Sequence, residues 1–147
     1  MIGLYIEQRA LKGTTSLSQD LVGHILRQQR RGRVAIVTNK PITLLGAVRK
    51  QWSKTIHRVE REQVSTLGTL RKLQLADELS HLRRTTFTTE LPINEPIADI
   101  AFATARDFLQ APPTCYTLYI TCAIERHERY MLASWMPPHG LVVVYES

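Results

Sequence analysis

Apolar and polar positions along the chain predict short strands that alternate with helices. Unbroken apolar runs, typical of strands buried on both faces, lie near 33–38 and 141–145. Apolar residues spaced by three and four follow Ser16 and Ser18, and Arg30-Arg31-Gly32 closes that helix. The predicted strands are 3–7, 33–38, 85–89, 97–103, 116–121 and 141–145, and short helices are predicted at 105–109 and 125–134.

A long helical segment is predicted over 41–84, with Pro41 at its first position. One apolar stripe follows helical spacing: Leu45, Val48, Trp52, Ile56 and Val59. Trp52 lies on this stripe, so we expect it in the core. The leucines of 67–82 lie on a rotated face, which favours a break near 65–68 but leaves a single bent helix open.

These elements predict an α/β fold: a mostly parallel, Rossmann-like sheet of about five or six strands with helices on both faces. We expect 85–89 to be an antiparallel edge strand. The chain has 147 residues, which suits a single domain over 1–147. No apolar run approaches the roughly 18 residues that span a bilayer, and the start does not resemble a signal peptide. We therefore expect a cytoplasmic protein without membrane contact.

The two cysteines, Cys115 and Cys122, are expected to be reduced, since they belong to one predicted strand and would face its opposite sides. With His127 and His139 they match no zinc-ligand spacing, so no metal is expected. The nucleotide-binding signatures G-x-G-x-x-G and G-x-x-x-x-G-K-[ST] are absent, and no cofactor is expected.

Charged side chains are distributed unevenly along the chain. Residues 25–87 contain fourteen basic and four acidic side chains, whereas residues 88–147 contain three basic and seven acidic ones. Such asymmetry indicates one face suited to an anionic partner, although a solvated helical surface is an equally good interpretation.

The basic residues of the helix after Pro41 lie opposite its apolar stripe, at about 100° per residue. The predicted nucleic-acid-binding residues are Arg30, Arg31, Lys50, Lys54, Arg58 and Arg61, with His57 on the same face. DNA and RNA both remain open as partners.

A second candidate site follows from topology, because ligands of open parallel sheets bind outside the carboxyl ends of the strands. The residues expected there include Glu7, Asn39, Lys40 and Arg106. They favour a small enzyme or sensor that binds a nucleotide-like anion, and whether the chain is an enzyme stays open. A third hypothesis is a self-associating module, most simply a two-fold homodimer, since the leucines of 67–82 occupy more than one helical face.

Overall fold

Six strands form one parallel sheet in the order β1-β6-β5-β2-β4-β3. The computed structural model describes residues 5–11, 16–28, 33–62, 69–92, 99–122 and 125–146. The strands are β1 (Tyr5–Ala10), β2 (Val34–Val37), β3 (Phe87–Thr88), β4 (Ile100–Ala103), β5 (Thr117–Ile120) and β6 (Leu141–Glu146). The helices are α1 (Leu17–Gln28), α2 (Pro41–Glu62), α3 (Thr69–Arg84), α4 (Ala105–Gln110) and α5 (Arg126–Ser134).

The predicted Rossmann-like α/β fold is confirmed, with two corrections at the edges of the sheet. Segment 85–89 contributes only β3, which pairs with β4 in parallel and not antiparallel. A connection of about a dozen residues is long enough to bring the chain back for parallel pairing. At the other edge, β1 runs on to Ala10, beyond the predicted end at Glu7.

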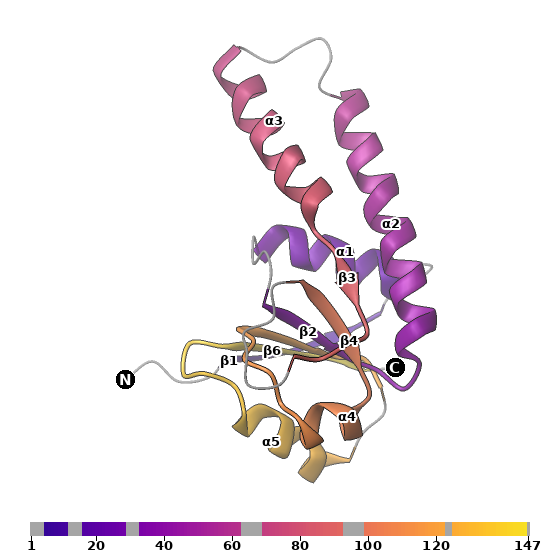
Figure 1. The fold of residues 1–147 in the computed structure, drawn as a ribbon, viewed down its shortest axis with the longest axis vertical. Coiled ribbons are helices and arrows are strands. Elements are labelled where there is room, and N and C mark those ends of the chain that lie inside the picture. The colour runs from indigo at the N-terminus through magenta and orange to yellow at the C-terminus, as the bar shows by residue number, and fades with distance from the viewer. Residues whose placement is uncertain are drawn as a thin grey trace.

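Helices cover both faces of the sheet, and the two faces have separate cores. Figure 1 shows α1, α2 and α3 on one side and α4 and α5 on the other. Buried residues of α1 and α2, among them Leu21 and Val48, pack on one face of the strands. Phe108 of α4 and Leu132 of α5 pack on the opposite face. We call these two sides the α2 face and the α5 face.

The predicted long segment 41–84 consists of two helices, α2 and α3, which project from the sheet as an arm (Figure 1). The expected break at 65–68 falls outside the described residues. Trp52 lies in the core, as predicted: it is 6% exposed. Its indole N–H donates to the carbonyl oxygen of Leu82, at the end of α3, at 3.1 Å. Its ring also meets Phe87 edge-on. Trp52 is therefore one of the buried residues that fix the base of the arm.

The cysteines lie outside β5, which spans only Thr117–Ile120, and this corrects the expectation that they face opposite sides of one strand. Both pack against the core of the α5 face, Cys115 buried and Cys122 half-buried. Within the described residues, no three His, Cys, Asp or Glu side chains gather where a metal ion could be held. None of the helices in the described ranges has the length and apolar character needed to cross a membrane.

Candidate functional site

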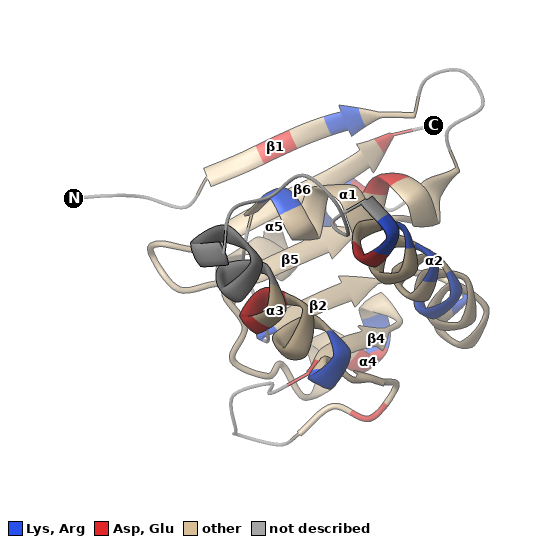
Figure 2. Ribbon diagram, turned by 90° about the horizontal axis from the view of Figure 1, so that it is seen from above, with Lys and Arg blue, Asp and Glu red and all other residues tan. Residues whose placement is uncertain are grey.

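The outward face of α2 displays the basic residues that the sequence singles out. Because 3.6 residues complete a helical turn, burial of Val48 and Trp52 against the sheet turns the opposite side of α2 to solvent. Lys50, Lys54, Arg58 and Arg61 are all exposed there. From the first to the last, these cations extend about 16 Å along the helix axis. Figure 2 shows basic residues along the exposed length of α2.

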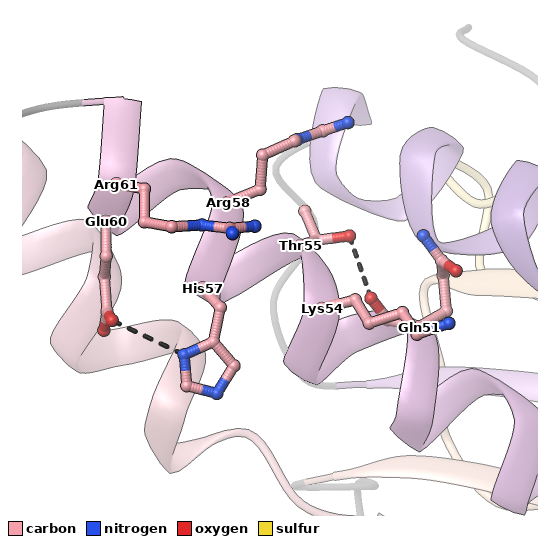
Figure 3. A pocket seen from close by; sticks show the side chains of 7 residues that line it. All are labelled: Gln51, Lys54, Thr55, His57, Arg58, Glu60 and Arg61. Atoms are coloured by element: carbon pink, nitrogen blue, oxygen red, sulfur yellow. Dashed lines mark hydrogen bonds and ion pairs between the residues drawn. The ribbon is translucent and has the colours of Figure 1, made fainter.

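An open depression of about 620 Å³ lies within this surface. Figure 3 shows the side chains that line it, all of which come from α2: Gln51, Lys54, Thr55, His57, Arg58, Glu60 and Arg61. Thr55 donates its hydroxyl hydrogen to the carbonyl oxygen of Gln51, one helical turn earlier, at 2.9 Å. Gln51 adds its side-chain amide, a further donor and acceptor, to the lining of the depression.

No carboxylate of the described residues neutralises the four predicted cations. Among the described residues, none of Lys50, Lys54, Arg58 and Arg61 forms an ion pair. The acidic residue of the depression, Glu60, pairs instead with Arg83 of α3 and lies 3.7 Å from Nδ1 of His57. Its negative charge is therefore compensated from outside the row of cations.

The basic surface differs in two respects from the one predicted. Arg30 and Arg31 fall outside the described residues, so the structure does not connect them with α2. Arg49, which the sequence reasoning omitted, is exposed on the flank of α2. At 100° per residue, Arg49 lies about 80° around the helix axis from Pro41, between the apolar stripe and the basic face. This position could have identified it as partly exposed from the sequence.

A second group of polar residues meets at the carboxyl ends of the three central strands. The chain leaves β2 toward the α2 face and leaves β4 and β5 toward the α5 face, so the connections diverge beside β2, the place where open parallel sheets bind ligands. The strand-end residues there are Thr38, Asn39, Lys40, Thr104, Arg106 and Thr121. The register pairs Val37 with Ala103 and with Ile120, so the three threonines follow at one level.

Each of these threonine hydroxyls already has a partner. The Thr38 oxygen accepts from the backbone N–H of Lys40 at 3.3 Å, and Thr104 caps α4 by accepting from Asp107 N–H at 3.1 Å. Thr121 donates to the carbonyl oxygen of Val37 at 3.2 Å. Asn39, Lys40 and Arg106 are exposed. The structure thus brings three of the four predicted strand-end residues together at the carboxyl ends of the central strands.

Glu7 does not belong to that group, which corrects the prediction. It lies in the middle of β1, opposite Val143 of β6, because the strand continues to Ala10. Its carboxylate lies 3.0 Å from Nη1 of Arg9 and 3.3 Å from Nε2 of His24. Glu7 is therefore part of a structural network at the edge of the sheet.

Sequence reasoning missed this network, which joins α1 to β1 and β5. Arg9 of β1 binds both carboxylate oxygens of Asp20 in α1, at 3.0 and 3.1 Å. His24 of α1 is 2% exposed, and its Nδ1 lies 2.9 Å from the hydroxyl of Tyr119 in β5. The histidine stood on the apolar side of its predicted helix, beside Leu21 and Ile25, and this was the available signal.

The network perturbs the pKa values of its members. Burial lowers the pKa of His24 from 6.5, and the nearby Glu7 carboxylate offsets this only in part. For Glu7, burial opposes ionisation, but hydrogen bonds from Arg9 and His24 outweigh it and lower its pKa below 4.5. The Arg9 guanidinium lowers the pKa of Asp20 in the same way. With the buried His24 and Tyr119 closed to solvent, the arrangement is suited to fixing β1 and α1 in place.

Comparison with known protein families, with curated proteins and with solved structures finds no match for this chain.

Proposed function

We propose that this chain binds nucleic acid through the outward face of α2, mainly by contacts to the phosphate backbone. The observation that carries the proposal is the row of four exposed cations that have no carboxylate partner among the described residues. Unpaired cations in a row attract a linear polyanion and release its counterions when it binds. The pairing of Glu60 with Arg83 supports the proposal, since it removes a charge that would repel phosphate.

Contacts of this kind position a duplex or a single strand without reading its sequence. The polar groups beside the cations that could reach a base or sugar are few, chiefly the Gln51 amide and the Thr55 hydroxyl. No aromatic side chain lines the depression among the described residues, so base stacking is not expected to contribute. The proposed role is accordingly that of an accessory or regulatory protein with weak sequence preference.

Two double variants test the proposal at equal net charge. Lys54→Gln with Arg58→Gln removes two cations from the α2 face, whereas Arg27→Gln with Arg126→Gln removes two exposed cations from α1 and α5. Binding of labelled single- and double-stranded DNA and RNA is measured at low salt. The first pair should weaken binding at least tenfold more than the second. Equal losses would mean that net charge alone is responsible, and no binding by the folded wild-type protein would refute the proposal.

A second candidate function is binding of a small anion, such as a nucleotide, at the carboxyl end of β2. The specific observation is that the chain connections beside β2 leave toward opposite faces of the sheet, with Asn39 and Lys40 at the start of α2. A saturable rise in melting temperature with nucleotides, lost in Lys40→Gln and kept in Lys54→Gln, would favour this function over nucleic-acid binding.

A further inference from the structure

The outer edge of β1 is the side of this strand that faces away from β6. β1 is the terminal strand of the sheet, and no described strand pairs with it on the side away from β6. Figure 2 shows β1 at the margin of the molecule, and it contains no proline. Tyr5 and Ile6 are 63% and 48% exposed. An edge strand of six residues that no described strand covers is a template for another strand.

The backbone groups that face outward can be identified. In a parallel pair, successive residues direct their N–H and C=O groups alternately toward the two sides of the strand. The N–H of Tyr5 donates to the carbonyl oxygen of Gly140, just before β6, at 3.2 Å. Tyr5, Glu7 and Arg9 therefore hydrogen-bond toward β6. It follows that Ile6, Gln8 and Ala10 present their N–H and C=O groups to the outer edge.

We propose that two copies of this chain pair through β1 in antiparallel fashion, with Gln8 opposite Gln8 of the second copy on a two-fold axis. An antiparallel pair exchanges hydrogen bonds only where outward-facing residues oppose one another. In this register Gln8 meets Gln8, and Ile6 meets Ala10 of the second copy. All three outward-facing residues of each strand then find backbone partners.

The side chains select this register by charge. On the α2 face it places Glu7 opposite Arg9 of the second copy, in the closely spaced type of pair where side chains interact most. Both side chains are about a quarter exposed, at 26% and 27%, so each still has room for a second partner. Two residues further along, Tyr5 meets Leu11, which is also exposed at 39%.

The neighbouring registers are unfavourable. A shift of two residues in one direction opposes Glu7 with Glu7, and a shift in the other direction opposes Arg9 with Arg9. Like charges directly across a strand pair are destabilising. A shift of one residue places residues whose N–H and C=O groups face the outer edge opposite residues whose groups face β6. The backbone hydrogen bonds between the two copies are then lost. The sequence Tyr5–Leu11 is thus self-complementary in one register only.

The pairing has a consequence for the shape of the assembly. A two-fold axis between antiparallel neighbours of one sheet runs perpendicular to the sheet, so both copies present the α2 face on the same side. The two arms of α2 and α3 then rise from one side of a continuous twelve-strand sheet, twice the six strands of one chain. This inference concerns assembly and does not depend on what the α2 face binds.

Light scattering and sedimentation equilibrium of the full chain, without nucleic acid, test the proposal. The wild-type protein at high micromolar concentration should have twice the 16.8 kDa mass of one chain. Gln8→Pro removes an outward N–H and no bond to β6, so it should give a folded monomer. Gln8→Ala keeps that N–H and should remain dimeric. A monomeric wild-type protein, or a dimer that survives Gln8→Pro, would overturn the proposal.

A second pair of variants tests the register and does not require proline. Ile6 and Ala10 are exposed and oppose each other across the proposed axis. Ile6→Lys with Ala10→Lys sets lysine against lysine and should lower dimer affinity at least tenfold. Ile6→Lys with Ala10→Glu sets lysine against glutamate and should restore it. If the two double variants associate equally, the register, and with it the proposal, is wrong.

Discussion

Nε2 of His24 lies 3.3 Å from Oε2 of Glu7, so a fully buried imidazole of α1 meets a carboxylate from the middle of the edge strand. A carboxylate only accepts hydrogen bonds, and Glu7 stays ionised because its pKa is lowered. Nε2 must therefore carry the hydrogen, which leaves Nδ1 to accept from the hydroxyl of Tyr119 at 2.9 Å. This defines one tautomer of a neutral histidine that links α1, β1 and β5.

The first prediction concerns acid stability. The pKa of His24 in the folded chain lies below the 6.5 of an exposed imidazole, so the unfolded chain binds more protons between these two values. The free energy of unfolding should therefore decrease as the pH falls below about 6.5, and the loss should continue until the pH passes the folded pKa. Urea unfolding at a series of pH values between about 7 and 5 measures it.

Two histidine variants assign this pH dependence. His24→Gln removes the titrating group and should flatten the slope below about pH 6.5. His57→Gln changes an exposed histidine and keeps His24, so the slope that His24 causes should remain. Further loss as the pH passes below about 4.5 should persist in both variants, because Glu7 and Asp20 have lowered pKa values. An unchanged slope in His24→Gln would contradict the role given to this residue.

The second prediction concerns the two tryptophans, which form a natural matched pair. Trp52, which belongs to α2, is 6% exposed and packs against Phe87 and the core of the α2 face. Trp135 is 56% exposed. Trp52→Ala should lower the free energy of unfolding by about 3 to 5 kcal/mol, as truncation of large buried aromatics does. Trp135→Ala should lower it by less than about 1 kcal/mol. Equal losses would show that Trp52 does not anchor the arm.

The central strands were predictable because four consecutive apolar residues, such as Val34–Val37, need apolar cover on both faces whatever surrounds them. The inward stripe of α2 was predictable for the same reason, since burial repeats with the helical period. What covers Trp52 was not predictable, because the accepting carbonyl belongs to Leu82, thirty residues further along the chain. Local pattern determines which side is buried, and tertiary packing determines its partner.

The edge strand shows where local pattern fails. Glu7 and Arg9 resemble the polar residues that end a strand, and the prediction ended the strand there. In the folded chain they stay within β1 because Asp20 and His24 of α1 bind them. This compensation requires a helix and a strand to be docked first, so no window of the sequence contains it. The same contacts removed Glu7 from the predicted strand-end group.

The third prediction concerns thiol reactivity. Burial raises the pKa of Cys115 to about 12 and also raises that of Cys122, so at neutral pH both thiols stay protonated and unreactive. Labelling of the folded protein with a disulfide reagent should be slow, with Cys122 ahead of Cys115 because only Cys122 is partly exposed. Both should react at once in denaturant. Fewer than two reactive thiols under those conditions would reveal a disulfide or another modification.

The last prediction concerns salt. Each phosphate contact to duplex DNA contributes about −0.9 to the slope of log affinity against log salt concentration. If Lys50, Lys54, Arg58 and Arg61 each bind one phosphate, the slope should be about −3.6. Changing all four to alanine should bring it close to zero, while the free energy of unfolding changes by less than about 1 kcal/mol, since exposed charges without partners contribute little to stability. The intermediate variant with only Lys54 and Arg58 changed should lose about half of the slope. A steep slope in the variant with all four residues changed would place the phosphate contacts elsewhere on the chain. Affinity that does not depend on salt concentration would exclude an interface based on phosphate contacts.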